Sequence, residues 1–264
     1  MEIKEKIVWI TGASSGIGEA LAYAFAKEKA KIIISSHQAV ELEAVKLECQ
    51  AMDAEVTAVC FDLSDSESIK QSVNQMLAKY GKVDILINNG GISQRSLIRE
   101  TPIEIDRKVM EINYFGGVYL TKLLLPAMIN QKQGYIAVTS SIVGKFGFPL
   151  RSAYSASKHA IQGFYETLRF EEKENNIKVT IIIPGRVKTN ISINAVTKDG
   201  KTYGKMDDGQ NNGITPEKSA SIIIKAIKNN KREVLVGGKE LLMVHFRRYI
   251  PALFYKLASK MKHT

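Results

Sequence analysis

Residues 7–18 read Ile7-Val8-Trp9-Ile10-Thr11-Gly12-Ala13-Ser14-Ser15-Gly16-Ile17-Gly18 and decide the fold. The first four form an unbroken apolar run, as in strands buried on both faces of a sheet. A turn with three glycines follows and leads into a segment of helical periodicity. Such a turn lets backbone N–H groups and a helix N-terminus approach a phosphate, so it predicts a nucleotide-binding loop. Glycines that serve only a tight turn would produce the same pattern.

The same turn also fits a hydrolase motif. Gly12-Ala13-Ser14-Ser15-Gly16 matches GxSxG, the pattern of a nucleophile elbow. That mechanism needs an acid and then a histidine after later strands. His159 lies inside a helical pattern and His245 lies in the C-terminal tail, so a serine hydrolase is disfavoured.

Strand and helix patterns alternate along the rest of the chain. Seven short apolar runs are strand candidates: Ile7–Ile10, Lys31–Ser35, Val56–Phe61, Val83–Ile87, Tyr135–Thr139, Val179–Ile183 and Glu233–Val236. Apolar residues recur at helical spacing between them, in Ala20–Lys29, Val40–Gln50, Ile69–Tyr80, Ile105–Met128 and Ala153–Asn175. This alternation predicts an α/β fold, a doubly wound parallel sheet of seven strands with helices on both faces.

The composition is that of an ordinary globular domain. Of 264 residues, 45% are hydrophobic and 24% are charged, which excludes wholesale disorder and collagen-like or coiled-coil sequences. No linker or repeat divides the chain, so a single domain over residues 1–264 is expected. Cys49 and Cys60 show no metal-ligand spacing, and no metal is expected. No signal peptide or membrane span stands out, which favours a cytoplasmic protein.

The net charge of +10 is concentrated near the C-terminus. Residues 225–264 contain ten Lys and Arg against two Asp and Glu, whereas residues 1–224 contain 27 against 25. Because no nucleic-acid-binding module is visible, no nucleic-acid partner is expected. Residues 239–264 combine apolar and basic side chains in an amphipathic tail. Such a tail favours packing on a partner subunit or over the substrate entrance, or peripheral contact with an anionic membrane.

Residues 188–215 interrupt the alternation of strands and helices. They contain four glycines and little regular periodicity. A long irregular insert in a compact domain is usually a functional lid. It follows the sixth predicted strand, which places it at the carboxyl edge of the sheet, where open α/β sheets bind ligands.

Tyr154 and Lys158 are four residues apart on a predicted helix and therefore share one of its faces. A nearby ammonium favours tyrosinate and should lower the pKa of the phenol, which would then serve as a general acid or base for a carbonyl or alcohol. The spacing alone is weak, because Tyr23 and Lys27 repeat it in this chain.

Polar or glycine-rich residues at several strand ends strengthen that interpretation. Ser140-Ser141 ends the fifth predicted strand, Asn88-Asn89-Gly90-Gly91 the fourth and Pro184-Gly185 the sixth. Asn113 interrupts a long helical pattern, where its low helix propensity can produce a kink that binds water. Since the carboxyl ends of parallel strands share one edge, these residues should converge on one site.

Two further positions bear on a dinucleotide. Asp62 follows the third strand and could accept a hydrogen bond from an adenine amine, or could be an acid at a helix N-terminus. The second strand ends in Ser35-Ser36-His37, with no acid to bind a ribose 2′-hydroxyl. Small polar and potentially cationic side chains leave room for a 2′-phosphate. This favours NADP(H), with NAD(H) as the second possibility.

Together these motifs resemble the short-chain dehydrogenase/reductase family over almost the whole chain. The motifs are Thr11-Gly12-x3-Gly16-x-Gly18, Asn88-Asn89-x-Gly91, Asn113, Ser141, Tyr154-x3-Lys158 and Pro184-Gly185, in the order and intervals of the family. Residues 88–96 and 152–160 are similar to the member-seven group of dehydrogenase/reductases, on the hydroxysteroid and retinoid oxidoreductase branch. His37 departs from the Arg usual in NADP-using relatives. Gly90 departs from the more common Ala, although the member-seven group shares the Gly.

The resemblance implies a Rossmann-like domain, commonly in homodimers or homotetramers, with assigned site roles. Tyr154 would be the acid/base, Ser141 would steady the substrate oxygen, and Lys158 would lower the pKa of Tyr154 and hold the nicotinamide ribose. Asn113 would support a water relay to Lys158. The expected cofactor-binding residues are Gly12, Ser14, Ser15, Gly16, Ile17, Gly18, Ser36, His37, Asp62, Leu63, Asn89, Gly90, Tyr154, Lys158, Pro184, Gly185, Val187 and Thr189.

Side chains near the catalytic motifs and in the lid are candidates for substrate contact. They are Ser93, Gln94, Phe146, Phe148, Arg151, Tyr203 and Met206. Aromatic and Met side chains suit a low-polarity substrate. Phe146 and Phe148 could equally be core contacts, and Arg151 is expected to be a solvated surface arginine rather than a partner for an acidic group.

The sequence thus predicts an NADP(H)-preferring oxidoreductase that transfers a hydride between the cofactor and the carbonyl or secondary alcohol of a small, low-polarity molecule. One alternative is a 3-oxoacyl-carrier-protein reductase, which needs a basic surface for an acidic carrier. A second is a nicotinamide-sensing binding protein with little catalysis, which the intact Ser141, Tyr154 and Lys158 set disfavours.

Overall fold

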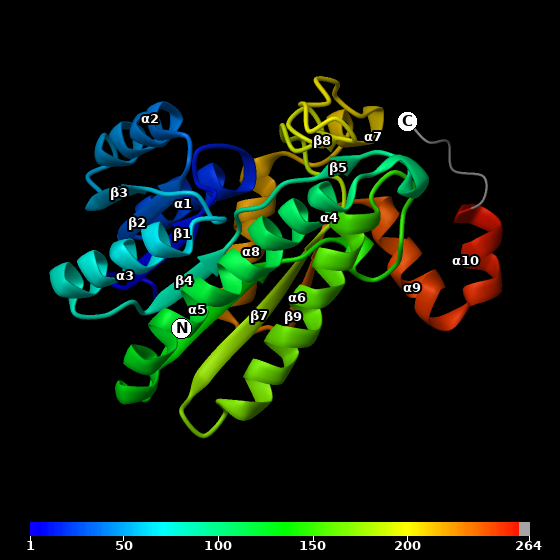
Figure 1. Ribbon diagram of the computed structural model, residues 1–264. Coiled ribbons are helices and arrows are strands. Elements are labelled where there is room, and N and C mark those ends of the chain that lie inside the picture. Colours follow the sequence, from blue (N-terminus) through cyan, green and yellow to red (C-terminus); the bar gives the residue numbers. More distant parts are fainter. Residues whose placement is uncertain (259–264) are drawn as a thin grey trace.

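The computed structural model describes residues 1–258 and contains a central seven-stranded sheet (Figure 1). Every strand pair in it is parallel, in the order β3-β2-β1-β4-β6-β7-β9. The strands are β1 Ile7–Thr11, β2 Lys31–Ser36, β3 Val56–Cys60, β4 Ile85–Asn88, β6 Gly134–Thr139, β7 Ile177–Pro184 and β9 Glu233–Val236. All seven strand predictions and the α/β fold class are confirmed.

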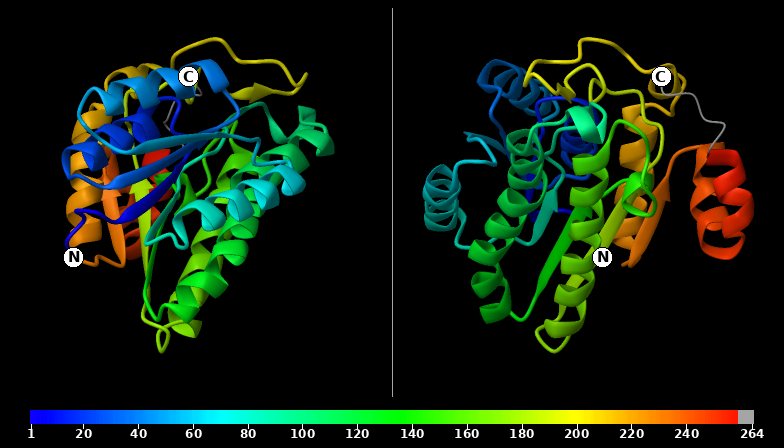
Figure 2. Two further views of the ribbon diagram at one scale, coloured as in Figure 1. Left: turned by 90° about the vertical axis from the view of Figure 1, so that its left-hand side faces the viewer. Right: turned by 45° about the vertical axis from the view of Figure 1, so that its right-hand side comes forward.

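Helices cover both faces of the sheet and complete three layers (Figures 1 and 2). Buried residues of α1, α2 and α8 share one apolar core with the sheet, and those of α3, α5 and α6 share the other. The helices are α1 Gly16–Lys27, α2 Ala39–Gln50, α3 Ser66–Tyr80, α4 Ile103–Met110, α5 Gly116–Asn130, α6 Ser152–Glu171, α7 Asp208–Asn211, α8 Pro216–Lys228, α9 Leu242–Tyr249 and α10 Pro251–Ala258.

The unbroken apolar runs form the central strands because both faces of each strand are covered. In β1, Val8 and Ile10 contribute to one core, while Trp9 contributes to the other. All three side chains are completely buried. A strand with alternating polar residues would place polar groups beneath one layer of helices, at a cost of several kcal/mol for each unpaired group.

The strand order reverses between β1 and β4. From β1 the chain continues outward to β2 and β3, and then returns to β4 on the other side of β1. Crossover connections on opposite sides of this point leave a crevice at the carboxyl ends of the two strands, where sheets of this type bind ligands. The polar and glycine-rich ends of β1, β4, β6 and β7 all face this edge.

The long helical pattern around Asn113 is a single helical path with an irregular middle. A π-helical turn, Glu111–Phe115, joins α4 to α5. Among the described residues, Ile103–Asn130 is the one helical stretch that is long enough and apolar enough to span a membrane, judged by length and composition alone. In its most apolar part, 44% is buried inside the protein. Leu120, Leu124 and Met128 pack in the core beneath the sheet, so the stretch serves as a core helix.

Two segments lie outside the sheet and its helices. Residues 188–215 form an irregular segment over the carboxyl edge that contains only the two-residue strand β8, Val196–Thr197, and the single-turn α7 (Figure 2). β8 pairs with a second short strand, β5, Gln94–Arg95. Residues 239–258 form a turn followed by α9 and α10, and the remaining part of the predicted tail, 259–264, lies outside the described residues.

A buried polar cluster joins the end of β4 to the two helices beneath it. Asn88 Nδ2 donates to Thr121 Oγ1 of α5 and to Tyr165 Oη of α6, at 2.9 Å each. The Tyr165 and Thr121 hydroxyls lie 2.8 Å apart, and Gly117 O accepts from both. The Asn88 Nδ2 and the two hydroxyls pair with one another and with Gly117 O, whereas the buried Asn88 Oδ1 has no partner among the described residues. The paired groups fix the depth at which α5 and α6 pack on the sheet.

We expect Tyr165→Phe to lower the free energy of unfolding by about 1–2 kcal/mol, because it leaves Asn88 Nδ2 and Thr121 with fewer partners in a buried site. Urea unfolding followed by circular dichroism measures the change. Tyr249→Phe is the matched control, since Tyr249 is 73% exposed. Equal stability of the two variants would contradict a stabilising role for the cluster.

Candidate active site

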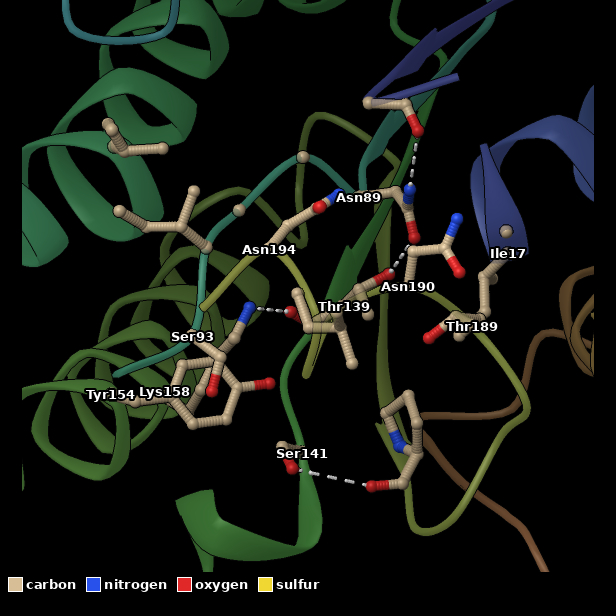
Figure 3. A pocket seen from close by; sticks show the side chains of 18 of the residues that line it. Ile17, Asn89, Ser93, Thr139, Ser141, Tyr154, Lys158, Thr189, Asn190 and Asn194 are labelled. Atoms are coloured by element: carbon tan, nitrogen blue, oxygen red, sulfur yellow. Dashed lines mark hydrogen bonds between the residues drawn. The ribbon is translucent and has the colours of Figure 1, made fainter. Parts of the chain in front are cut away.

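A cavity of about 950 Å³ opens at the carboxyl edge of the sheet, where the strand order reverses. Figure 3 shows Tyr154, Lys158 and Ser93 on one side of it and Ile17, Thr189 and Asn190 on the other. The first group comes from the loop after β4 and from α6, whereas Ile17 lies in the first turn of α1 and the other two residues follow β7. A volume of this size accommodates an extended ligand together with a second, smaller molecule.

The glycine-rich turn forms one end of the cavity. Its backbone conformation and close contacts leave no room for a side chain at two of its glycines. Gly12 and Gly16 have φ values of +63° and +62°, in the left-handed region. A Cβ on Gly12 would lie 2.6 Å from Gly90 Cα, and one on Gly18 would lie 2.2 Å from Gly12 O. Gly18 packs at the start of α1, behind the lining. The turn thus brings bare backbone and the N-terminus of α1 to the cavity, as phosphate binding requires.

Hydrogen bonds join this turn to the end of β4. Thr11 Oγ1 accepts from the backbone N–H groups of Asn89 and Gly90, both at 3.0 Å. Asn89 Nδ2 donates in return to Thr11 O at 3.2 Å and Gly12 O at 3.3 Å. Asn89 Oδ1 accepts from Thr139 Oγ1 of β6 at 3.2 Å. Asn89 therefore ties three strand ends together in addition to lining the cavity.

The end of β2 supplies a polar, acid-free wall. The Ser14 and Ser36 hydroxyls lie 2.9 Å apart, and Ser14 Oγ also lies 2.9 Å from Gln38 Oε1. His37 is exposed and lines the same wall. A 2′-phosphate on an adenosine ribose would meet hydroxyls and an imidazole here.

Asp62 lies at the cavity edge, and Asp65 takes the helix-capping role that was its alternative. Asp65 Oδ1 accepts from the backbone N–H groups of Glu67 and Ser68 at the start of α3. Asp62 Oδ1 instead accepts from Ser64 N at 2.8 Å and Ser64 Oγ at 2.7 Å. Partial burial opposes its charge, but these hydrogen bonds and the nearby His37 and Lys108 hold the pKa of Asp62 below its usual value. It is thus an ionised acceptor facing the cavity.

The predicted cofactor residues gather around the cavity. Those that line it are Gly12, Ser14, Ser15, Gly16, Ile17, Ser36, His37, Asp62, Leu63, Asn89, Gly90, Tyr154, Lys158, Pro184, Gly185, Val187 and Thr189. The bare turn, the helix N-terminus and the ionised Asp62 give this end of the cavity the donors and acceptors that a dinucleotide needs. The residues therefore fit a nicotinamide cofactor.

Tyr154 and Lys158 reach the cavity from successive turns of α6. The Lys158 Nζ lies 5.7 Å from the centre of the Tyr154 ring and donates to Thr139 O of β6 at 2.8 Å (Figure 3). Ser140 Oγ donates to Lys158 O at 2.9 Å, which holds the helix against the strand. The equally spaced Tyr23 and Lys27 lack this setting, and Tyr23 Oη donates to Glu19 at 3.0 Å.

Burial dominates the electrostatics of this pair. It lowers the pKa of Lys158 to about 8, because Lys158 is only 3% exposed. Burial also raises the pKa of Tyr154, although the Ser141 hydroxyl and the charges of Arg95 and Arg151 act in the opposite direction. In the cofactor-free site the cost of desolvating the phenolate is therefore larger than the interactions that lower the pKa of Tyr154, and the contribution of Lys158 to that pKa stays a prediction.

Ser141 follows β6 in an extended conformation that points its hydroxyl into the cavity. Its Oγ accepts from Val143 N at 3.3 Å and donates weakly to Pro184 O at 3.4 Å (Figure 3). Both hydrogen bonds are long, so the hydroxyl can reorient toward a substrate oxygen at small cost. The strand end thereby places a hydroxyl beside the Tyr154 phenol.

Asn113 lies in the π-helical turn and holds the loop after β4. Its Oδ1 accepts from Ile92 N at 2.7 Å, and its Nδ2 donates to Ile92 O at 2.9 Å and Ser157 Oγ at 3.0 Å. The side chain is thus engaged on both sides, and it positions the loop and α6 relative to each other. Its water relay to Lys158 stays a prediction.

The predicted substrate residues divide into two groups. Ser93, Phe146, Phe148 and Arg151 line the cavity, whereas Gln94, Tyr203 and Met206 do not. Gln94 is completely buried, and its amide contacts Ser96, Thr101, Ser152 and Ala153 behind the wall. Tyr203 packs behind Arg95, and the Met206 Sδ accepts from Ser192 Oγ. Their side chains therefore support the wall from outside.

The sequence prediction of a solvated Arg151 is wrong, and two residues that contact or neighbour it, Arg95 and Asp207, carry no sequence signal for this site. The Arg151 side chain is 13% exposed and lies 2.7 Å from Asp207, so it is not a solvated surface arginine. Arg95 also pairs with Asp207 in the cavity wall. Periodicity could not find Arg95 or Asp207, since the contact joins residues 112 positions apart.

Comparisons with known proteins agree with this geometry. A family model described as short chain dehydrogenase matches residues 6–200. The chain is 41% identical over 264 residues to the dehydrogenase/reductase SDR family protein 7-like of Drosophila melanogaster, covering 98% of this chain and 81% of that protein. It is 43% identical over 262 residues to the dehydrogenase/reductase SDR family member 7B of Mus musculus, covering 97% and 81%. The chain therefore belongs to the short-chain dehydrogenase/reductase family, which confirms the predicted resemblance.

Solved structures show the same fold. A short-chain dehydrogenase/reductase from Burkholderia phymatum in complex with NAD superimposes with a TM-score of 0.85 at 24% identity, covering 96% of each chain. An alcohol dehydrogenase from Thermococcus sibiricus complexed with 5-hydroxy-NADP has a TM-score of 0.76 at 25% identity, covering 89% of this chain and 97% of that one. The family is one of oxidoreductases, and its fold binds nicotinamide cofactors of both kinds.

The buried Lys158 makes a prediction about stability. We expect Lys158→Met to raise the free energy of unfolding of the cofactor-free protein by about 1–2 kcal/mol near pH 6.5. Lowering the pKa of Lys158 from 10.5 to about 8 corresponds to about 3 kcal/mol of unfavourable charge burial, which the substitution removes. The substitution also removes the hydrogen bond to Thr139 O, which contributes about 1 kcal/mol of stability and reduces the net gain. Urea unfolding measures the difference.

The gain should shrink with rising pH. Because the folded-state pKa of Lys158 lies below the unfolded one, the penalty is complete below about 8 and disappears as the pH approaches 10.5. Lys122→Met, at an exposed position of α5, is the control and should change stability little at either pH. A Lys158→Met variant destabilised equally at pH 6.5 and 10 would contradict the assigned burial cost.

Proposed function

We propose that the protein is an NADP(H)-preferring dehydrogenase/reductase that interconverts a carbonyl and a secondary alcohol in a low-polarity substrate, with Tyr154 as general acid/base. One observation carries the proposal: Tyr154 and Lys158 project from α6 beside Ser141 into the cavity that the glycine-rich turn of β1 closes at its other end. A hydride donor and a proton donor can therefore meet in one space.

The glycine-rich turn, Asp62 and Asn89 would hold the adenosine and phosphate part of the cofactor, and Lys158 would hold the nicotinamide ribose. When bound, a nicotinamide cofactor supplies or accepts the hydride at its C4 position. The chain contributes orientation and a proton. Phe146, Phe148 and Met243 give the cavity an apolar surface near Arg151, which suits a substrate of low polarity.

The raised pKa of Tyr154 favours the role of acid at neutral pH. A protonated phenol can donate to the carbonyl oxygen as that oxygen gains charge during reduction, while the Ser141 hydroxyl steadies the same oxygen. A Lys158 pKa of about 8 lets its amine exchange a proton near the working pH. Alcohol oxidation requires the phenolate and should improve as the pH rises.

The test of this function is reduced-cofactor oxidation over a panel of ketones, aldehydes, quinones and one 3-oxoacyl thioester, with NADPH and NADH. We expect Tyr154→Phe to lower kcat by at least about 100-fold, the range typical of lost general-acid catalysis. Cofactor affinity, measured by quenching of protein fluorescence, should change by less than about threefold, because the ring remains.

Tyr23→Phe is the control, since its spacing to Lys27 is the same but its hydroxyl contacts Glu19. Unchanged turnover in Tyr154→Phe would disprove the assigned chemistry. Turnover of the acyl thioester and of no free ketone would favour the carrier-protein reductase. Cofactor binding without turnover on any compound would favour the sensor.

Cofactor preference depends on the end of β2. We expect Ser36→Asp to lower the ratio of kcat/KM with NADPH to that with NADH by about 10-fold or more, because a carboxylate repels a 2′-phosphate and accepts from a 2′-hydroxyl. His37→Arg should raise the same ratio, since a guanidinium binds phosphate in a bidentate manner. If both variants changed this ratio in the same direction, the 2′ position of the adenosine ribose would not lie at the end of β2.

The C-terminal helices contribute to the site from one side. Met243 of α9 and Phe254 of α10 pack with Phe146, with the Phe146 and Phe254 ring centres 5.0 Å apart, so this part of the tail covers the cavity wall. Contact of the outer face with a second subunit or an anionic membrane stays a prediction. That face includes exposed apolar residues: Leu242, Tyr249, Ile250 and Tyr255.

A further inference from the structure

A buried ion cluster forms part of the cavity wall near Tyr154. Arg95 Nη2 and Arg151 Nη2 lie 2.5 Å and 2.7 Å from the same oxygen, Oδ2, of Asp207. The side chains of Arg95, Arg151 and Asp207 are 6%, 13% and 8% exposed, and all three residues line the cavity. Two guanidinium groups against one carboxylate leave a net positive charge in a place largely removed from water.

The cluster brings together three parts of the chain. Arg95 lies in β5 after the end of β4, Arg151 directly precedes α6, and Asp207 belongs to the irregular segment 188–215. Arg151 is three residues before Tyr154, and both guanidinium charges act on the Tyr154 phenol. The positive charge therefore belongs to the reaction end of the cavity, away from the glycine-rich turn.

The positive charge of the cluster is incompletely balanced. Arg95 Nη1 donates to Ser93 Oγ at 2.7 Å and to Gln94 O at 2.6 Å, but its buried Nε has no partner in the described structure. Burial and the neighbouring Arg95 both lower the pKa of Arg151, which Asp207 only partly offsets. Such an arrangement costs free energy in the ligand-free protein, and an additional anion would reduce that cost.

Apolar side chains flank the cluster on the Arg151 side. The Arg151 guanidinium lies 4.9 Å from the centre of the Phe148 ring, and Phe148 packs with Phe146 and Met243, which also line the cavity. An apolar wall that ends in two guanidinium groups complements a molecule with an apolar body and an anionic end.

We propose that Arg95 and Arg151 form a subsite for an anionic group, a carboxylate or a phosphate, on an otherwise low-polarity carbonyl substrate. The inference rests on the proposed function, because the subsite extends the substrate pocket of that function. Guanidinium groups bind both anions through paired charge-assisted hydrogen bonds. Asp207 occupies the same guanidinium groups and repels an incoming anion, so it sets the affinity of the subsite.

A purely structural role is the competing explanation. In that case the cluster only holds segment 188–215 against β5 and the start of α6. Removal of the Arg151 guanidinium or of the Asp207 carboxylate would then loosen the segment in the same way. A subsite predicts opposite effects, because loss of a guanidinium removes attraction whereas loss of the carboxylate removes repulsion. The sign of the two effects therefore separates the explanations without knowledge of the natural substrate.

The experiment titrates benzoate, phenyl phosphate and the neutral benzamide into the protein saturated with NADPH, followed by calorimetry. The bound cofactor keeps phenyl phosphate from the glycine-rich turn. We expect both anions to bind the wild type about 10-fold or more tightly than benzamide. Arg151→Met should weaken anion binding by about 10-fold or more, and Asp207→Asn should tighten it. Benzamide affinity should stay constant in both variants.

Arg99→Met is the matched control, since the Arg99 side chain is 79% exposed and lies outside the cavity, and it should change none of these affinities. Arg151→Lys keeps the charge and should retain most of the anion preference if Arg151→Met proves unstable. Equal affinities of benzoate and benzamide for the wild type, or weaker anion binding in both Arg151→Met and Asp207→Asn, would overturn the proposal.

Failure of the proposed function remains distinguishable from failure of this inference. Tyr154→Phe should lose turnover but bind benzoate as the wild type does, because the phenol is not part of the subsite. Titrations without cofactor, using benzoate and benzamide, repeat the comparison should NADPH fail to bind. A preference for benzoate that Arg151→Met removes then supports the subsite even where the assigned reaction is wrong.

Discussion

The close approach of the Gly12 turn to Gly90 is the constraint on which the site depends. The two glycines approach so closely that a Cβ at Gly12 would lie 2.6 Å from Gly90 Cα, and Thr11 Oγ1 binds both backbone N–H groups of the opposing loop. Because β1 and β4 are neighbours where the strand order reverses, this contact sets the width of the crevice. It also holds the phosphate-binding turn at a constant distance from the strands that carry the reaction residues.

The reaction end is organised from the opposite side by α6. The helix is held to β6 through Ser140 and Lys158, to the π-helical turn through Asn113, and to β4 through Tyr165. These contacts place two ionisable groups in a poorly solvated position, which shifts the pKa values of Tyr154 and Lys158 in opposite directions. The protein therefore accepts a loss of stability in order to hold a protonated phenol beside an amine that exchanges its proton near neutral pH.

Charge is distributed unevenly along the cavity. The wall at the end of β2 is neutral and polar, whereas the wall near Tyr154 contains two guanidinium groups and one carboxylate. The first arrangement suits a phosphorylated ribose, and the second would recognise the far end of a substrate. Segment 188–215 covers the cavity, and in the proposed subsite it would also take part in substrate recognition through Asp207. In the proposed function, the loops that follow different strands would thus separate cofactor recognition from substrate recognition.

The sequence by itself determined the seven strands, their parallel arrangement, the glycine-rich turn and the Tyr154–Lys158 pair. Each depends on local periodicity or fixed spacing, which a single chain displays. Only the tertiary structure decided that Gln94 supports the wall from behind and that Arg95, Arg151 and Asp207 meet in it. It also decided that burial raises the pKa of Tyr154. These properties depend on contacts between distant segments and on exclusion of water, which spacing along the chain does not encode.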